Sequence, residues 1–300
     1  MKNHNSMIFK KKGPLLLFLV PAFAFLAVYL FYPFVLNIWN SFQDIGGLGQ
    51  APAGMNDPWY KNYTDMATDP VMHTAILNTL LIMLCTILFQ VGIALVLALM
   101  VDGIRVGNQF FRTVYFFPII ISATALGLMF NMVFLYDGGM VNELLHSMGL
   151  ISKNIDWKDQ SHWFFTMTAP VMWQYVGFYF VIIVTGLNNI SPDIYEAAEI
   201  DGASAMQRIF RIKLPLLHNT LMTCLVLAIT GALKVFDLPW TMFPNGIPLN
   251  ASWLTGTYMY KQTLGGAQNV DYGSAISILI VVLGVVISQV ANAIFKEKDY

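Results

Sequence analysis

The stretch SPDIYEAAEIDGASAMQRIFRIKLPLL, residues 191–217, is a polar segment between two long apolar runs. It carries six charged side chains close together: Glu196, Glu199, Asp201, Arg208, Arg211 and Lys213. Because an apolar chain gains nothing from burying such a segment in hydrocarbon, we expect the stretch to lie in a loop outside the membrane. Its partners and its local structure are therefore the central questions about this sequence.

The helix-capping residues of this stretch predict two short helices. Ser191 is a favoured N-cap, and Pro192 suits the first helical position. Gly202 is placed to end that helix, since glycine adopts the left-handed C-cap conformation at little cost. Ser204 then caps a second helix, and Gln207 three residues later completes a capping box.

The composition of the whole chain indicates a membrane protein. The 300 residues are 57% hydrophobic and only 11% charged, with a mean hydropathy of +0.61, whereas soluble domains carry about 25% charged residues. A helix needs about 20 apolar residues to cross a bilayer. The runs of that length predict an all-α, polytopic membrane protein with six transmembrane helices, at about Leu15–Leu36, Thr74–Val101, Thr113–Leu135, Trp163–Leu187, Leu217–Phe236 and Ser274–Phe295.

The first apolar run is interpreted as a retained transmembrane helix. It is longer than the apolar part of a signal peptide, and no small-residue cleavage site follows at the usual distance. Pro21 and Pro33 lie inside this run. Because proline removes a helical hydrogen bond, we expect the helix to be kinked or relaxed at these positions.

The basic residues predict the orientation in the membrane. With both termini in the cytosol, the inner segments hold eleven of them: Lys2, Lys10, Lys11, Lys12, Arg105, Arg112, Arg208, Arg211, Lys213, Lys296 and Lys298. The outer segments hold five: Lys61, Lys153, Lys158, Lys234 and Lys261. Because cytosolic loops of membrane proteins are enriched in Lys and Arg, residues 188–216 are predicted to face the cytosol.

Several classes of function lack their motifs in this sequence. There is no GxxxxGK[ST] phosphate loop, HExxH zinc motif or GxSxG nucleophile motif, and the five histidines are scattered. We therefore predict no ATP site of that type, catalytic residue, metal site or cofactor. Asp, Glu, Lys and Arg are absent from the apolar interiors of the first four spans and the last, which disfavours an ion-coupled secondary carrier but leaves it as an alternative.

A resemblance narrows the interpretation. EAAEIDGASAMQRIFRIKLP resembles the EAA motif of binding-protein-dependent ABC importer permeases, with matching residues at Glu196-Ala197-Ala198, Asp201-Gly202-Ala203, Phe210, Ile212 and Leu214-Pro215. Residues 62–80 are similar to the segment that leads into the second span of this family. Residues 136–150 and 233–240 are similar to its carbohydrate-uptake branch, which includes maltose, glycerol-phosphate and multiple-sugar permeases. On the residues alone, the loop could equally be an amphipathic hairpin on the membrane surface.

The resemblance implies a type I ABC importer permease fold and a non-catalytic subunit. Residues 1–300 would form a single transmembrane permease domain, with a core at 74–295 that includes the coupling loop at 188–216. The partners implied are a second permease subunit, two copies of a cytosolic ATPase subunit, an extracytoplasmic solute-binding protein, membrane lipid and a carbohydrate, without nucleic acid. The protein would lie in a bacterial cytoplasmic membrane with both termini cytosolic.

The resemblance also assigns roles to residues. The ATPase-coupling residues would be Glu196, Ala197, Ala198, Asp201, Gly202, Ala203, Phe210, Leu214 and Pro215, with Glu196 paired to a basic residue and the alanines allowing close packing. Aromatic and hydrogen-bonding side chains make a candidate sugar path of Trp173, Gln174, Tyr175, Tyr179, Lys234, Asp237 and Trp240. Alternatively, the aromatic residues anchor the helices at the membrane surface, Lys234 pairs with Asp237, and the solute is not a sugar.

Overall fold

A computed structural model of the chain describes residues 12–103 and 107–294. Its contacts divide the chain into two units, residues 1–68 with 262–278 and residues 69–261 with 279–300. Some residues used above lie outside the described ranges: Lys2, Lys10, Lys11, Arg105, Phe295, Lys296 and Lys298. Within the described ranges the chain is mostly helical, with two strands of two residues each.

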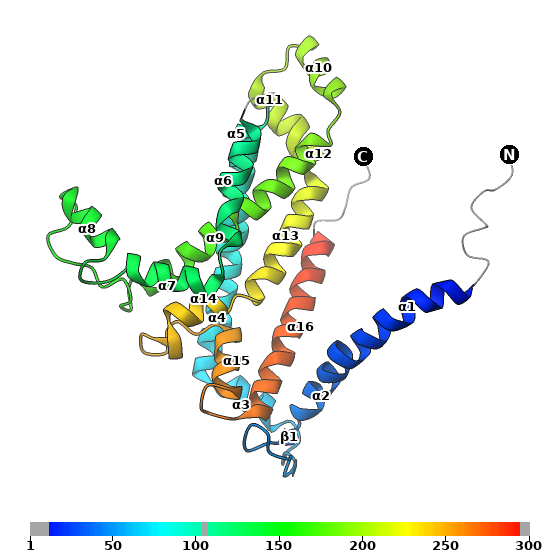
Figure 1. The fold of residues 1–300 in the computed structure, drawn as a ribbon, viewed down its shortest axis with the longest axis vertical. Helices are drawn as coiled ribbons and strands as arrows, with labels where there is room; N and C mark the ends of the chain where they lie inside the picture. The colour runs from blue at the N-terminus through cyan, green and yellow to red at the C-terminus, as the bar shows by residue number, and fades with distance from the viewer. Residues whose placement is uncertain (1–11, 104–106, 295–300) are drawn as a thin grey trace. The chain divides into compact units, whose positions relative to one another are not determined.

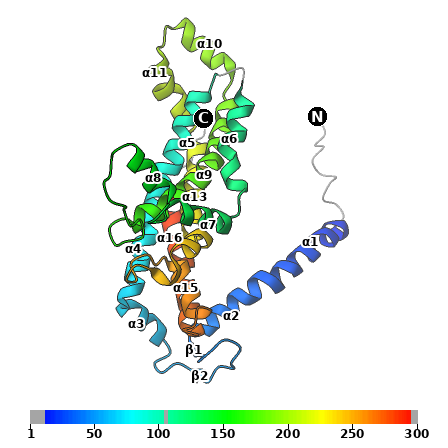
Figure 2. The ribbon, with the colours of Figure 1, turned by 60° about the vertical axis from the view of Figure 1, so that its left-hand side comes forward.

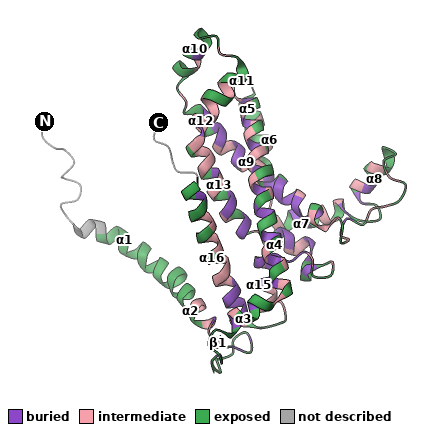
Figure 3. Ribbon diagram, turned by 180° about the vertical axis from the view of Figure 1, so that it is seen from behind, coloured by how far each residue is buried: buried purple, intermediate pink, exposed green. Residues whose placement is uncertain are grey.

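The first unit begins with one continuous apolar helix made of α1 (Lys12–Leu26), the π-helical turn η2 (Ala27–Phe31) and α2 (Tyr32–Asn40). The π-turn ends two residues before Pro33, whose ring would clash with the carbonyl four residues earlier in a regular α-helix. The predicted relaxation of this helix is thus found beside its second proline. Residues 16–36 are all exposed (Figure 3), a surface that suits lipid or another apolar chain.

The rest of the first unit is held by asparagine side chains. Its elements are β1 (Gln43–Asp44), β2 (Gly54–Met55), α3 (Lys61–Thr68) and the beginning of α16 (Val270–Ile294). The two strands pair in antiparallel register. Buried Asn62 donates to the Ser41 carbonyl and to the Asp271 carboxylate, both at 3.1 Å. Asn37 donates to Ser277, so both α2 and α3 are tied to α16.

The second unit is a bundle of long helices with short helices at its ends (Figure 1). Its elements are α4 (Pro70–Cys85), η3 (Thr86–Val91), α5 (Gly92–Val101), α6 (Asn108–Ile120), α7 (Ala123–Val133), α8 (Met140–Ser147), α9 (Trp163–Asn188), α10 (Pro192–Ile200), α11 (Ala205–Arg208), η4 (Ile209–Lys213), α12 (Leu214–Leu216), α13 (His218–Leu233), α14 (Asp237–Met242), η5 (Pro244–Gly246), most of α15 (Thr255–Thr263) and the rest of α16. In Figures 1 and 2, α10 and α11 lie beyond the ends of α5 and α6.

Helix α9 is the centre of this bundle and packs against α5, α6 and α13. Phe180 and Ile183 on α9 are completely buried. A Cβ atom at Gly177 would lie 1.8 Å from the carbonyl oxygen of Tyr115 in α6. Only glycine therefore allows these two backbones to approach so closely, as small residues commonly do between membrane helices.

Within residues 12–103 and 107–294, five helices are long and apolar enough to cross a membrane, or six if one bent pair counts as a span. The third predicted span, over 113–135, corresponds to this bent pair, in which α6 and α7 meet at an angle of 92°. Ile121 and Ser122 have extended backbones there, with ψ angles of 133° and 134°. Pro118 lacks an N–H group and destabilises the last turn of α6.

The other spans agree with the prediction apart from their ends. The second begins at Pro70 instead of Thr74, because Asp69 caps the helix by accepting a 2.8 Å hydrogen bond from the Val71 N–H. The fifth is interrupted after Leu233 and resumes as α14 at Asp237. Interruptions in α6–α7 and in α13–α14 therefore produce two short helices, which pack against each other.

The apolar side chains of residues 141–148 are divided between two surfaces of α8. Val141 and Leu145 pack against the buried cluster of the bundle. Leu144 and Met148 are exposed. The packed side is fixed by Asn142, which is fully buried and donates to the Ile155 carbonyl at 3.0 Å.

Candidate functional site

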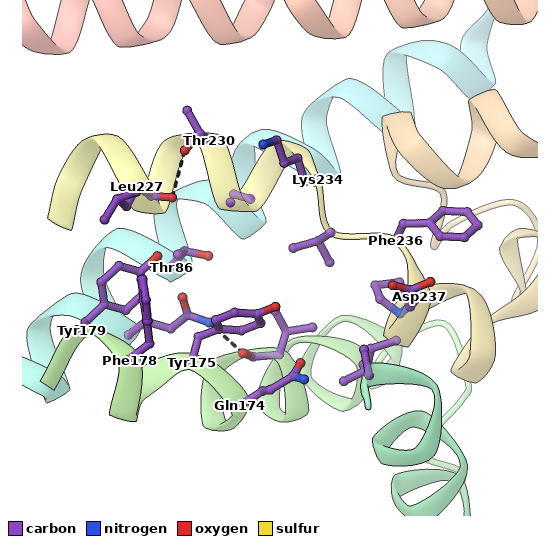
Figure 4. Close-up of a pocket in the computed structure, with 18 residues that line it drawn as sticks. Thr86, Gln174, Tyr175, Phe178, Tyr179, Leu227, Thr230, Lys234, Phe236 and Asp237 are labelled. Atoms are coloured by element: carbon purple, nitrogen blue, oxygen red, sulfur yellow. Dashed lines mark hydrogen bonds between the residues drawn. The ribbon is translucent and has the colours of Figure 1, made fainter. Parts of the chain in front are cut away.

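A cavity of ≈ 300 Å³ lies inside the second unit. Its wall is formed by η3, α9, the end of α13 and the beginning of α14 (Figure 4). Phe178 and Tyr179 lie at one end of the view, and Phe236 and Asp237 at the other. The two interruptions described above create this space, since the first residue of α7, Ala123, and the first turn of α14 also line it.

Five of the seven residues predicted for a sugar path line this cavity: Gln174, Tyr175, Tyr179, Lys234 and Asp237. The two tryptophans do not. Trp173 lines a separate apolar groove and makes an edge contact with Phe130, with ring centroids 5.8 Å apart. Trp240 stacks on Phe236 and packs against Tyr260 at 4.8 Å between centroids.

The two charged side chains of the cavity are separate. Within the described ranges, neither Lys234 nor Asp237 takes part in an ion pair. Both side chains are exposed in the isolated chain. The interpretation that Lys234 simply neutralises Asp237 is therefore not what the structure shows, and both charges remain available to a solute or a partner.

The sequence reasoning missed several polar and aromatic residues of the cavity, among them Thr86, Gln90, Phe178, Thr230 and Phe236. A signal existed for Gln90, which is the one amide within the apolar run 79–101. Its side chain donates to the Val171 carbonyl at 2.7 Å. The amide of Gln174 similarly donates to the Ile121 carbonyl at 3.3 Å, which gives a hydrogen bond to the backbone exposed by the break between α6 and α7.

The side chains of the cavity combine two kinds of chemistry. Four aromatic rings offer flat apolar faces, from Tyr175, Phe178, Tyr179 and Phe236. Hydroxyl, amide, ammonium and carboxylate groups lie among them. Pockets that bind small molecules typically combine apolar walls with a few polar groups that fix orientation. The cavity is thus suited to a polar solute with apolar faces.

The loop 188–216 has the local structure that its capping residues predicted. Ser191 accepts from the Asp193 N–H at 3.4 Å at the start of α10. The helix ends at Asp201 and Gly202, and Gly202 has a φ of +73°. The Ala203 N–H donates to the Ala198 carbonyl at 2.9 Å and closes this C-cap. The predicted capping box between Ser204 and Gln207 is present in α11.

The predicted coupling residues of α10 differ in their surroundings. Glu196 and Ala197 are exposed, whereas Ala198 is buried within the chain. Glu199 forms an ion pair with Arg208. Among the described residues Glu196 has no ion-pair partner. Glu196 and Ala197 are therefore accessible on the surface of the chain, while Ala198 contributes to packing inside the loop.

The second half of the loop connects it to the bundle. Phe210 is 62% exposed, and Leu214 and Pro215 begin α12. Lys213 forms an ion pair with Asp102 at the end of α5, and its ammonium lies 5.3 Å from the ring centre of Tyr195. Burial raises the pKa of the Tyr195 hydroxyl, and the negative charge of Asp102 raises this pKa further.

The same ion pair places the end of α5 beside the loop 188–216. Asp102 and Lys213 are 111 residues apart in the sequence. Their contact brings the end of α5, from which the chain continues to α6, to the same end of the bundle as the loop 188–216.

The described part of the chain contains no group of three or more His, Cys, Asp or Glu side chains that could hold a metal ion.

One protein family and several known proteins are similar to this chain in sequence. The sequence model of the family described as "Binding-protein-dependent transport system inner membrane component" matches residues 90–298. The probable ABC transporter permease protein YurN of Bacillus subtilis (strain 168) is 30% identical over 93% of this chain and 95% of its own length. The sulfoquinovosyl glycerol transport system permease protein SmoG of Agrobacterium fabrum is 29% identical over 94% of this chain and 90% of its own length.

A solved structure has the same fold. It is a chain of the bacterial alginate ABC transporter in complex with alginate pentasaccharide-bound periplasmic protein. The TM-score is 0.83 at 23% sequence identity, and the match covers 95% of this chain and 94% of that one. This chain thus shares its overall fold with a chain of a solved membrane transporter.

Proposed function

Because the chain belongs to the family of binding-protein-dependent transport system inner membrane components, we propose that it is a membrane-spanning permease subunit of an ABC importer for a carbohydrate. In this role it forms part of the translocation path and couples ATP-driven closure of a partner to alternating access. The observation that carries the proposal is the loop 188–216. Its capped helix α10 presents Glu196, which is exposed and has no ion-pair partner among the described residues, at one end of the bundle.

The coupling role follows from the chemistry of that loop. A short helix fixed at both ends by caps is a rigid element, which transmits movement better than a flexible loop. Glu196 offers a charge to a basic side chain of an ATPase, and Ala197 beside it allows close approach. Asp201, Gly202 and Ala203 form the C-cap that holds the helix in its orientation.

The proposed assembly contains a second permease subunit, two copies of a cytosolic ATPase subunit and an extracytoplasmic solute-binding protein. The family description names dependence on a binding protein. The exposed apolar surface of residues 16–36 offers an area for lipid or for the second permease. ATP hydrolysis belongs to the ATPase subunits, and this chain acts as their non-catalytic membrane partner.

A carbohydrate is the proposed solute class. The relative SmoG is described as a transporter of sulfoquinovosyl glycerol, and the structural neighbour carries alginate. The cavity of this chain combines aromatic faces with hydrogen-bonding groups, as a solute with both C–H faces and hydroxyl groups requires. Glycerol phosphate remains the alternative solute, with Lys234 as the group that would meet its phosphate.

The proposal places α10 and α11 in the cytosol of a bacterium and the chain in its cytoplasmic membrane, with both termini cytosolic. Single cysteines introduced at exposed Asp57 and Lys153 are expected to react with a membrane-impermeant reagent in intact cells. A cysteine at exposed Ala205 should react only after the membrane is permeabilised. Labelling at position 205 in intact cells would contradict this orientation.

The test of the proposed function is reconstitution into liposomes. The chain is purified alone, and also together with the ATPase, second permease and binding protein produced by the same bacterium. We expect MgATP hydrolysis and ATP-dependent uptake of a radiolabelled oligosaccharide mixture only in the complete assembly. Proton-dependent uptake by the chain alone would instead support an ion-coupled carrier, and ATP hydrolysis by the chain alone would contradict its assignment as a non-catalytic subunit.

A further inference from the structure

Three side chains from distant parts of the second unit meet at the base of the loop 188–216. Asp102 is the C-cap of α5, Lys213 is the last residue of η4, and Tyr195 lies on α10. Lys213 forms an ion pair with Asp102 and places its ammonium over the Tyr195 ring at 5.3 Å from the centroid. The three residues are called the α5–α10 linkage below.

The linkage is shielded from solvent, unlike the other ion pair of the loop. The side chains of Lys213 and Asp102 are 17% and 18% exposed. In the pair between Arg208 and Glu199, the Glu199 side chain is 64% exposed. Solvent screens exposed pairs and leaves them weak, whereas removal of one member of a shielded pair leaves a charge that is poorly compensated.

The linkage supplies a connection that the polypeptide chain does not. The loop is joined covalently to α9 before α10 and to α13 after α12. Near the second of these joints the chain contains the π-turn η4, and Pro215 follows without an N–H group. A contact with α5 gives α10 a third point of attachment and so restricts rotation about the two covalent joints.

The end of α5 opposite Asp102 leads to the wall of the cavity. Helix α5 continues directly from η3, which contributes Thr86 and Gln90 to the wall of the cavity. The ten residues of α5 span about 15 Å at the usual rise of a helix. One continuous helical segment, made of η3 and α5, therefore runs from the linkage to the cavity wall.

We propose that Asp102, Lys213 and Tyr195 make α10 and α5 move as one body, so that displacement of α10 is delivered to the cavity wall at Thr86 and Gln90. This inference rests on the proposed function, because it takes α10 to be the element that the ATPase moves. Tyr195 and Lys213 act as positioning residues. Their side chains set the orientation of α10 relative to α5.

The test is a distance measurement between two spin labels in the assembled transporter. Labels are attached to cysteines introduced at exposed Met100 on α5 and exposed Ile200 on α10, after Cys85 and Cys224 are replaced by alanine. With the linkage intact, we expect one narrow distance peak, unchanged between the nucleotide-free complex and the complex trapped with MgATP and vanadate. In Lys213→Met the peak should broaden about twofold, since α10 then samples orientations that the ion pair excludes.

The matched control is Arg208→Met, which removes the ion pair confined to the loop and should leave the peak narrow. Asp102→Asn and Tyr195→Leu, each made alone, should also broaden the peak. The test therefore does not depend on the correct folding of a single variant. The reversed pair Asp102→Lys with Lys213→Asp should restore a narrow peak. A narrow peak in Lys213→Met and Asp102→Asn, in both nucleotide states, would overturn the linkage.

A failure of the proposed function gives a different result. If the peak broadens in Lys213→Met but uptake by the complete assembly is unchanged in both Lys213→Met and Glu196→Lys, the linkage exists and α10 is not the coupling element. If uptake is unchanged in Lys213→Met and abolished in Glu196→Lys, α10 is the coupling element and the linkage does not deliver its movement to the cavity. If the peak stays narrow while Glu196→Lys abolishes uptake, α10 couples to the ATPase and its movement reaches the cavity by another route.

Discussion

Replacing Glu196 with lysine is expected to reduce uptake about a hundredfold or more in the complete assembly, while the permease remains folded in the membrane. Glu196 is exposed and has no ion-pair partner among the described residues, so the substitution disturbs little within the chain. At the proposed interface with the ATPase, the lysine would face a basic side chain. Like charges brought together at an interface cost several kcal/mol, and about 1.4 kcal/mol corresponds to a tenfold change. Uptake per complex, normalised to permease in the membrane, is the measurement.

Gly202→Val separates charge from geometry in the same loop. Gly202 has a φ of +73°, a conformation that a β-branched residue adopts only with strain. A compensating acidic substitution in the ATPase should partly restore uptake in Glu196→Lys and should have no such effect in Gly202→Val. Sugar affinity of the isolated binding protein should be the same throughout. Normal uptake and normal ATPase association in both variants would favour a surface hairpin without a coupling role.

Filling the cavity is expected to abolish uptake by a different route. Gly231 lines the cavity, and the nearest atom to a Cβ at this position is the Tyr179 hydroxyl, 3.9 Å away. A tryptophan there projects its indole into a space of ≈ 300 Å³. We expect Gly231→Trp to lower uptake at least about tenfold, because the indole occupies most of the volume that a drug-sized solute requires. Assembly with the ATPase and its basal ATP hydrolysis should be retained, in contrast to Glu196→Lys.

The matched control for this prediction is Gly231→Ala. Its methyl group has room in the structure, and alanine is favoured over glycine inside a helix by about 1 kcal/mol. Uptake and assembly should therefore be close to normal in this variant. Equal uptake by the alanine and tryptophan variants would show that this cavity does not lie on the path of the solute.

The features of the loop 188–216 were predictable because their signals are local. The cap at Ser191, the turn at Gly202 and the capping box of Ser204 and Gln207 each depend on side chains within one helical turn of the backbone groups that they contact. Patterns of this kind can be identified in a sequence without knowledge of its fold. The same holds for the apolar runs, whose length relates directly to the thickness of a bilayer.

The break in the third span shows where local signals were insufficient. Pro118 was visible in the sequence, but prolines inside α1 and α9 do not produce a comparable turn. At residues 121 and 122 the break is accompanied by Gln174 on α9, which donates to the Ile121 carbonyl. Backbone groups without helical hydrogen bonds are tolerated at membrane depth only where such partners exist. A partner 53 positions away in the sequence cannot be identified from the residues around the break.

The sequence by itself determined that this chain is helical, that it crosses a membrane and that one polar loop carries capped helices. Tertiary structure decided which of the predicted residues share a cavity: Gln174 faces it, whereas the adjacent Trp173 lies on another side of α9. It also decided that Lys213 pairs with Asp102, while Glu196 remains available to a partner. The physical reason is range. Capping and hydrophobicity act over one helical turn or sum over one span, but cavities and buried ion pairs form between helices whose approach is set by packing at positions such as Gly177, far away in the sequence.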